Sequence, residues 1–204
     1  MSLAQYNNKR DFKQTSEPSG KQSSLKEDQL KFVIQRHKAS RLHYDFRLEM
    51  EGVLKSWAVP KGPSLNPQDK RLAMMVEDHP YDYKDFEGII PEGNYGAGIV
   101  EIWDSGTYTP IEDQGNAKAN EKLLLAGLES GNLKVVLHGK KLKGEFAVVR
   151  LKGSDSNSWL LIKHRDKFAV DEEYNSEENT PKNSPINKWL AENKAGRSPA
   201  KKKS

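Results

Sequence analysis

The clearest alternation of apolar and polar positions lies in the sequence HYDFRLEM, residues 43–50. A period of two is typical of a β-strand with one buried face. The apolar positions of this segment are Tyr44, Phe46, Leu48 and Met50. The opposite face carries His43, Asp45 and Arg47, which is unusual for a merely solvated strand. On this segment alone, a wet outer face with a chance His–Asp pair is the simpler interpretation.

His37 changes that balance, because it lies six residues before His43 and the chain can turn back through Lys38, Ala39 and Ser40. Two imidazoles and one carboxylate form a facial ligand set for Mn, Fe or Zn that leaves coordination positions open for substrate. We therefore interpret the polar face as the lining of a site and expect it to point inward, into a cavity.

Short apolar segments elsewhere predict further strands at about 32–36, 42–50, 53–59 and 71–77. Glu51-Gly52 predicts a tight turn between the second and third of these, and Pro60 and Gly62 end the third. IVEIWDSGTYTP predicts a hairpin that turns at Asp104-Ser105-Gly106. The last predicted strands lie in LKVVLHG, GEFAVVRLK and SWLLIKHR.

One helix is predicted at about 117–130, with Asn116 as its N-cap and Gly131 as its C-cap. Roughly eight strands and one helix indicate a mainly β protein. A closed or nearly closed antiparallel β-barrel fits better than a sandwich, because several strands carry polar residues on one face that a cavity could use.

Both ends of the chain are polar and rich in turn-forming residues. We expect a flexible N-terminal arm at 1–30, in which only Tyr6 and Phe12 could act as anchors, a barrel domain at 31–170, and a disordered, C-terminally basic tail at 171–204. Within that tail, INKWLAENK predicts a helical turn or two.

A second cluster of polar side chains follows in RLAMMVEDHPYDY. It contains Arg71, Glu77, His79 and Tyr83, and Pro80 predicts that His79 lies on a loop just past a strand. Lys61 is expected at a strand end, where its side chain can face a cleft. The glycine-rich GIIPEGNYGAG that comes next matches no nucleotide-binding motif and reads as tight turns.

Composition narrows the class of protein. The 204 residues include no cysteine, which excludes disulfides and thiolate metal sites. No apolar stretch is long enough to span a membrane, and MSLAQYNNKR lacks a signal core, so we expect a cytoplasmic monomer without membrane contact. A net charge of +4 weakly favours a polyanionic partner.

Several motifs occur in the same order as in a known family. FVIQRHKASRLHYDFRLEMEGVLKSWAVPKGPS, EDHPYDY, EGIIPEGNYGAG, WDSGTY, LKGEFAVVRLK and WLLIKHRD together resemble the 3′-phosphoesterase domain of bacterial DNA ligase D and its stand-alone relatives. YNNKRDFKQTSEPSG is similar to the N-terminal arm of that family. The resemblance runs from about Tyr6 to Asp166.

The resemblance implies a manganese-dependent β-barrel enzyme that heals 3′ ends in end-joining repair, at the nucleoid. Such enzymes remove a 3′-terminal ribonucleoside from a primer strand and then remove the 3′-phosphate that is left, giving a 3′-OH. It also implies a primer–template substrate ending in DNA or RNA, and a ligase, polymerase and Ku-type protein encoded separately. Mn²⁺ is the implied cofactor, with Co²⁺ as an alternative of similar character.

Site residues carry over position by position. His37, His43 and Asp45 match the metal-binding residues of the family. Its phosphate-binding and catalytic positions correspond to Arg47, Lys61, Arg71, His79 and Tyr83, with Glu77 among them.

Two other classes of protein remain open from the residues alone. HGKKLKGE, from His138, nearly makes the motif of metal-free phosphodiesterases that form a phosphohistidine, but it ends in Glu145 and occurs once. A non-catalytic nucleic-acid-binding barrel is the other alternative, in which Trp57, Trp103 and Trp159 would stack on bases. Each of these tryptophans lies in an apolar strand, which favours a place in the core.

Overall fold

The structure is a computed structural model that describes residues 2–19, 29–153 and 157–195. Nine strands and three α-helices are present in these ranges, with one 3₁₀ helix, η1 (Tyr81–Asp85). The α-helices are α1 (Leu3–Asn8), α2 (Ala117–Ser130) and α3 (Pro185–Ala195). The strands are β1 (Leu30–Lys38), β2 (Leu42–Met50), β3 (Val53–Val59), β4 (Lys70–Pro80), β5 (Gly88–Ile90), β6 (Gly98–Pro110), β7 (Asn132–His138), β8 (Lys143–Arg150) and β9 (Ser158–Lys163).

The strands form an antiparallel barrel, which confirms the predicted fold class. Eight of them follow one another in the order β1-β2-β3-β4-β9-β8-β7-β6, and pairing between β1 and β6 closes the ring. β5 pairs with the first part of β6 and extends the sheet beyond the ring. Closure leaves no free edge on the eight ring strands.

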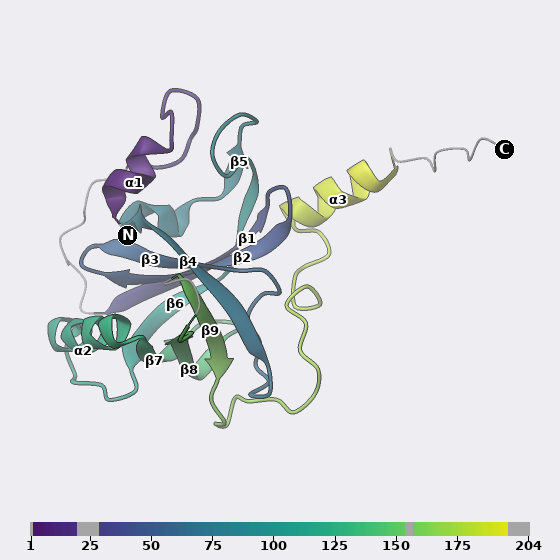
Figure 1. The fold of residues 1–204 in the computed structure, drawn as a ribbon. Coiled ribbons are helices and arrows are strands. Elements are labelled where there is room, and N and C mark those ends of the chain that lie inside the picture. The colour runs from purple at the N-terminus through teal and green to yellow at the C-terminus, as the bar shows by residue number, and fades with distance from the viewer. Residues whose placement is uncertain (1, 20–28, 154–156, 196–204) are drawn as a thin grey trace.

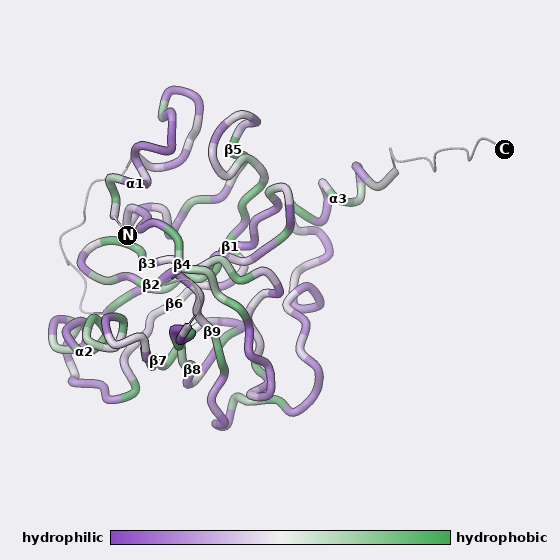
Figure 2. The backbone as a smooth tube through the Cα atoms, in the orientation of Figure 1, coloured by the Kyte–Doolittle hydropathy of each residue, from purple (hydrophilic) through white to green (hydrophobic). Residues whose placement is uncertain are grey.

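The alternation along β2 places its apolar side chains inside the barrel. Tyr44, Phe46 and Leu48 are buried there with Trp57 and Trp159. Trp57, Trp103 and Trp159 are 0%, 2% and 2% exposed, so the tryptophans belong to the core and offer no surface for stacking on bases. Figure 2 shows the same division, with the apolar positions concentrated in the barrel strands and polar loops and ends around them.

The polar face of β2 corrects the prediction of an inward-facing site. It lies on the outside of the barrel, where His43, Asp45 and Arg47 share a pocket with Arg10 after α1, Tyr83 of η1 and Ile90 of β5. Figure 1 shows α1 and β5 on the same side of the barrel. A second apolar cluster fills the space under these segments, formed by Tyr6, Val33, Leu54, Tyr83, Phe86, Ile90 and Val100. The barrel interior is filled by side chains, so the candidate cavity forms between the outer wall and the segments packed on it.

Turn chemistry accounts for several local structures. α2 has the predicted bounds, with Asn116 accepting a hydrogen bond from the backbone of Ala119 and Gly131 left-handed at φ 76°. The turn between β2 and β3 is confirmed at Glu51-Gly52, where both residues have positive φ.

The hairpin predicted at Asp104-Ser105-Gly106 is wrong, because β6 runs through these residues as one strand. The Asp104 carboxylate does not serve its own turn and instead accepts backbone N–H groups of Lys140, Lys141 and Leu142, in the turn between β7 and β8. Gly106 lies so close to the backbone of His138 that a Cβ there would be 2.2 Å from its carbonyl oxygen. Asp104 and Gly106 are therefore explained by their contacts with the end of β7 and the turn that follows it. They do not mark a reversal of the chain within β6.

His79 also differs from its predicted place on a loop. β4 continues to Pro80, and His79 pairs with Leu54 of β3. Proline lacks only the N–H and can occupy the last position of a strand, so it ends the ladder one residue later than expected.

The described ends of the chain are packed, which corrects the prediction of a flexible arm and a disordered tail in these parts. Tyr6 in α1 is 0% exposed, and Ser176 and Ile186 near the other end are also 0% exposed. Both ends pack through single apolar side chains, such as Tyr6 and Ile186, that lie within polar sequence. Such isolated residues form no periodic pattern from which packing could be predicted. Residues 20–28 and the basic tail GRSPAKKKS lie outside the described residues, and the boundaries at 31–170 remain predictions. Within the described ranges, no helix has the length and apolar character needed to cross a membrane.

Candidate metal and phosphate site

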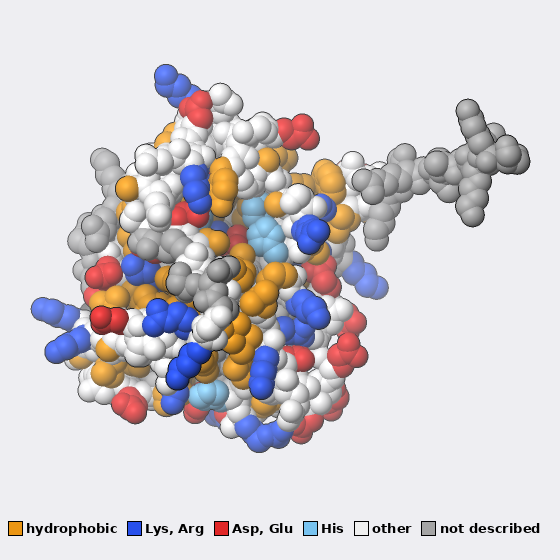
Figure 3. Space-filling view, viewed as in Figure 1, with side chains coloured by type: hydrophobic (Ala, Val, Ile, Leu, Met, Phe, Trp, Pro, Cys, Tyr) orange, Lys and Arg blue, Asp and Glu red, His pale blue; other side chains and the backbone are white. Residues whose placement is uncertain are grey.

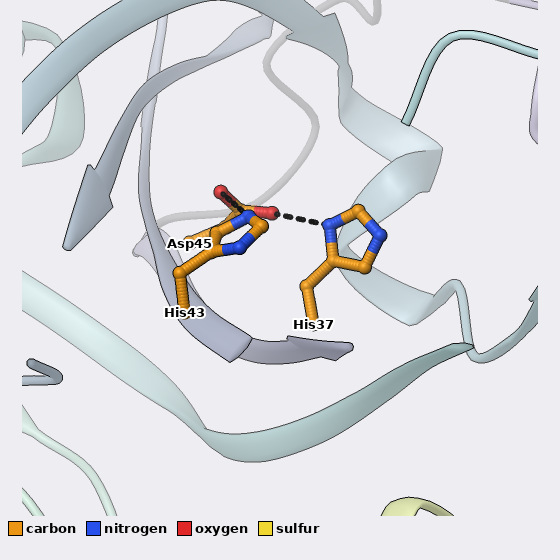
Figure 4. A group of neighbouring side chains, drawn as sticks. All are labelled: His37, His43 and Asp45. Carbon is orange, nitrogen blue, oxygen red and sulfur yellow. Dashed lines mark ion pairs between the residues drawn. The ribbon is translucent and has the colours of Figure 1, made fainter. Parts of the chain in front are cut away.

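Strand pairing brings three candidate metal ligands together on the outer face of the barrel. His37 on β1 is directly opposite His43 on β2, and Asp45 is the next residue on that face. His37 Nδ1 lies 3.6 Å from Asp45 Oδ2, and His43 Nε2 lies 3.6 Å from Asp45 Oδ1. One ligand atom from each residue lies within 4.8 Å of the others, and Figure 4 shows both imidazoles turned toward the carboxylate.

Backbone carbonyls fix the tautomers of both histidines. His37 Nε2 donates to the Gly96 carbonyl at 2.8 Å, and His43 Nδ1 donates to the Arg41 carbonyl at 3.0 Å. These bonds leave His37 Nδ1 and His43 Nε2 with lone pairs on the side of Asp45. Outer hydrogen bonds of this kind orient imidazole ligands in metal sites. The donor set therefore fits a divalent ion of borderline softness.

Arg47 forms the buried wall of the site beside these ligands, and it is 2% exposed. Its guanidinium donates to Gln35 Oε1 at 2.7 Å, to Ser56 Oγ at 2.9 Å and to Asp45 Oδ2 at 3.0 Å. Burial alone would raise the pKa of Asp45, but the charge of Arg47 and the neighbouring histidines hold it well below its usual range. Asp45 is therefore an ionised carboxylate, as a metal ligand must be.

A pocket of about 280 Å³ opens over this cluster. Its lining includes seven of the residues predicted from the sequence, His37, His43, Asp45, Arg47, Glu77, His79 and Tyr83. Figure 3 shows histidine side chains at the surface in the hollow that faces the viewer, with lysine and arginine side chains around it.

Two predicted residues are not among those that line the pocket. Lys61 is exposed in the turn after β3. Arg71 shares the face of β4 with Ala73, which is buried inside the barrel, and it donates to Asp69 and to the backbone carbonyl of Tyr174, both at 2.8 Å. The phosphate-binding roles assigned to Lys61 and Arg71 remain predictions.

Arg10 lines the pocket, although sequence reasoning assigned it no role. Its guanidinium contacts Glu17 Oε1 at 2.9 Å and Glu77 Oε1 at 3.3 Å, and stacks 3.7 Å from the centre of the Tyr6 ring. Arg10 is one basic residue in a polar arm, so no periodic pattern in the sequence predicts that it lines a pocket. The indications in the sequence were the nearby anchor Tyr6 and the similarity of YNNKRDFKQTSEPSG, which contains Arg10, to the N-terminal arm of the family.

His79 is held as a neutral imidazole on the opposite wall. Its Nδ1 donates to the Glu77 carbonyl at 2.9 Å, and its Nε2 accepts from Arg10 Nη2 at 3.4 Å. Burial, followed by the charges of Arg47 and Arg10, lowers the pKa of His79 well below its usual value. Beside it, Tyr83 donates to Glu17 Oε1 at 3.0 Å, and burial keeps the pKa of this phenol well above its usual value.

A closed antiparallel barrel with two histidines, an ionised aspartate and buried arginines on its outer wall belongs to the class of β-barrel proteins with a site suited to a metal ion and an anion. The chain is a member of the DNA Ligase D 3′-phosphoesterase domain family, whose model matches residues 35–150.

Curated relatives agree with this assignment. The chain is 52% identical over 170 residues to a multifunctional non-homologous end joining protein LigD of Pseudomonas aeruginosa, covering 82% of this chain and 19% of the relative. The LigD protein of Mycolicibacterium smegmatis is 42% identical over 165 residues, covering 81% of this chain and 21% of the relative. A LigD DNA repair protein of Mycobacterium tuberculosis is 42% identical over 170 residues, covering 83% and 20%. The chain thus spans about a fifth of the length of these relatives.

Proposed function

We propose that this protein is a manganese-dependent 3′-phosphoesterase that prepares DNA ends for joining. In the first step it removes a 3′-terminal ribonucleoside by phosphodiester hydrolysis, and in the second it removes the resulting 3′-phosphate to leave a 3′-OH. Membership of the 3′-phosphoesterase family supports this proposal. The observation that carries it is the cluster of His37, His43 and Asp45 in one pocket with Arg47 and His79.

His37 Nδ1, His43 Nε2 and an Asp45 oxygen would hold the metal ion, because they are the ligand atoms that the surrounding hydrogen bonds leave facing one another. Imidazole ligands favour Mn²⁺ or Co²⁺ over Mg²⁺, which prefers oxygen ligands and keeps several waters. When bound, such an ion supplies Lewis-acid polarisation of a phosphate oxygen.

Arg47 is proposed to stabilise the charge that develops on the phosphate. A guanidinium has five N–H donors. Within the described part of the chain, its Nε, Nη1 and Nη2 each use one N–H on Gln35, Ser56 and Asp45, which leaves two for a substrate oxygen. Because these three bonds fix the orientation of the Arg47 guanidinium, the group needs little reorganisation during the reaction. Arg10 adds a second cation at the pocket wall.

His79 is proposed as the group that protonates the leaving oxygen. Without substrate, its Nε2 faces the Arg10 guanidinium and carries no proton. The substrate phosphate, a monoanion in the diester step and a dianion in the monoester step, would offset the charges of Arg10 and Arg47 and raise the pKa of His79. The imidazole would then take up a proton at Nε2 and pass it to the leaving group. Tyr83 would turn its single O–H from Glu17 to a phosphate oxygen.

The substrate is proposed to be a primer–template with a 3′-phosphate or a 3′-terminal ribonucleotide. Lys61, exposed after β3, is expected to contact a strand phosphate outside the pocket. The LigD relatives are named as non-homologous end joining proteins, so we propose that a ligase, a polymerase and a Ku-type protein act on the same ends in the cytoplasm at the nucleoid. We expect the protein to act as a monomer.

The test is incubation of both primer–templates with the protein in metal-stripped buffer, with Mn²⁺ or Mg²⁺ added. We expect both steps in Mn²⁺, much slower turnover in Mg²⁺, and none with Asp45→Asn. Asp82→Asn is the matched control, because Asp82 is an exposed aspartate in η1 outside the pocket. Binding without turnover under every condition would favour the non-catalytic barrel, and turnover that resists EDTA would favour metal-free chemistry.

A further inference from the structure

A carboxylate from the C-terminal segment is fixed to the back of the candidate metal site. Glu177 accepts Arg36 Nε at 2.9 Å and Arg36 Nη2 at 2.6 Å. The same carboxylate accepts the hydroxyl of Tyr44 at 2.5 Å. Arg36 lies on β1 and Tyr44 lies on β2, where they are directly paired. Glu177 therefore ties together the two sides of one rung of the β1–β2 ladder.

That rung is adjacent in sequence to the metal ligands on both strands. Arg36 precedes His37, and Tyr44 lies between His43 and Asp45. Because side chains alternate across a strand, Arg36 and Tyr44 point to the side of the sheet opposite His37, His43 and Asp45. Glu177 therefore binds the β1–β2 pair from the side opposite the pocket. If Arg36 and Tyr44 shifted relative to each other, β1 and β2 would move past or away from one another. The three candidate ligands, which lie on these two strands, would then change their relative positions.

His43 also lies where β2 is paired on one side only, because the pairing of β2 with β3 begins at Tyr44, whereas His37 is paired with both His43 and Val100 of β6. His37 and His43 form the rung next to Lys38 and Leu42, which is the last pair before the connecting turn. Terminal rungs open more easily than those in the middle of a sheet. A metal site needs its ligands held to within about half an ångström, so the end of a hairpin needs additional support.

The C-terminal segment is anchored well enough to give that support. The Ser176 hydroxyl donates to the Pro63 carbonyl at 2.6 Å, and Thr180 Oγ1 accepts the indole N–H of Trp103 at 2.9 Å. Farther along, the Ile186 backbone N–H donates to Glu101 Oε2 at 3.0 Å. Glu177 is therefore held on both sides by contacts with the barrel.

We propose that Glu177 is a positioning residue for the metal site, acting through Arg36 and Tyr44 on the rung that carries His37 and His43. This inference rests on the proposed function, because it assumes that the three ligands bind a divalent ion. It extends the functional unit past residue 150, where the match to the family model ends, into a segment whose composition is that of a solvated tail.

The test compares Glu177→Gln and Glu178→Gln in the full chain. A glutamine Oε1 can keep the bonds from Arg36 Nε and the Tyr44 hydroxyl, whereas the amide N–H₂ replaces the oxygen that accepts Arg36 Nη2, and that bond is lost. Buried Arg36 keeps Glu101 at 2.8 Å and Asn187 at 2.9 Å as partners, so we expect the variant to fold. Glu178 is the matched control, an exposed neighbour that accepts a hydrogen bond from Asn175 within the same segment. The measurements are a Mn²⁺ titration by calorimetry at 25 °C and a metal-free melting curve for each variant.

We expect Glu177→Gln to raise the Kd for Mn²⁺ about fivefold or more, with Glu178→Gln unchanged and Glu177→Asp intermediate. An unchanged Kd in Glu177→Gln, even with a lowered melting temperature, would show a purely structural role and overturn the inference. If the unsubstituted protein bound no Mn²⁺, the proposed function would fail, and this inference with it. If it bound Mn²⁺ and Glu177→Gln bound it equally well, only the inference would fail.

Discussion

At the scale of single residues, the site is a set of opposite charges that neutralise one another before any ligand arrives. The sequence suggested crowded charges of one kind that metal and phosphate would relieve. Instead, Asp45 is paired with Arg47, and Arg10 lies between Glu17 and Glu77. The charges of the protein's own side chains therefore balance one another across the site, and these residues also contribute to folding.

This arrangement changes the expectation for Asp45→Asn. From the sequence, the substitution should leave metal-free stability unchanged or slightly raised. Because the folded protein stabilises the ionised carboxylate, we now expect a loss of roughly 1.5–3 kcal/mol in the free energy of unfolding, together with loss of Mn²⁺ binding. Urea unfolding without metal and a Mn²⁺ titration measure the two effects. Unchanged urea unfolding would mean that the Asp45–Arg47 pair contributes nothing net.

His79 predicts a dependence of metal-free stability on pH. Its pKa in the folded protein is lower than the value near 6.5 of an unfolded histidine. Below about pH 6.5 the unfolded chain therefore binds a proton that the folded protein does not. As the pH is lowered through this range, the free energy of unfolding decreases by up to about 1.4 kcal/mol per pH unit. Above that pH the histidine is neutral in both states and has no effect.

Unfolding free energies between pH 5 and 8 test this dependence. His79→Gln should flatten the slope below pH 6.5, whereas His138→Gln should retain it, because His138 is exposed and outside the pocket. An equal slope in all three proteins would assign the titration to other groups.

At the scale of elements, the N-terminal arm is one wall of the site. α1 places Tyr6 against the rings of His79 and Tyr83, with centroids 5.0 Å and 6.1 Å away. The residues after α1 bring Arg10 and Glu17 to the same place. The pocket is thus completed by a segment that contributes no strand to the barrel.

Replacing Arg10 tests the importance of this wall. Its side chain is 3% exposed and lies between the nearly buried carboxylates of Glu17 and Glu77, so Arg10→Gln leaves buried charge without its partner. We expect a loss of roughly 3–5 kcal/mol in the free energy of unfolding. Exposed Lys13→Gln is the control and should change stability by less than about 0.5 kcal/mol. A small effect of Arg10→Gln would show that the arm detaches readily.

At the scale of the whole molecule, the C-terminal segment packs against β1, β2, β6 and the loop after β3. The sequence led us to expect that removing 171–204 would leave the fold intact. The structure reverses this expectation, because the segment supplies Glu177 to buried Arg36 and buries Ile186 completely. We therefore expect the barrel and its C-terminal segment to unfold as one cooperative unit.

Truncation tests this unit directly. Ending the chain at Val170 should lower the melting temperature by several degrees, since a change of about 1 kcal/mol shifts it by roughly 2–4 °C in a domain of this size. Ending it at Ala195 keeps every contact described above and serves as the control. Equal melting curves for the two truncations and the full chain would show that the segment is dispensable for folding.

The sequence by itself determined most of the barrel strands, α2 and its caps, and seven of the side chains that line the pocket. These follow from local rules, namely the alternation along HYDFRLEM, the cap residues Asn116 and Gly131, and the positive-φ turn at Glu51-Gly52. Residues that act through their immediate neighbours leave a pattern in the sequence that can be read without the fold.

Only the tertiary structure decided on which side of the barrel the site lies and what completes it. Alternation separates two faces of a strand but does not say which one the closed sheet encloses, because that depends on the cover supplied by α1, η1 and β5. Arg10 and Glu177 reach the site region from distant segments, through contacts 67 and 141 residues away along the chain. Such contacts are made by single side chains in polar stretches, which have no periodicity, so their partners become apparent only when the chain is folded.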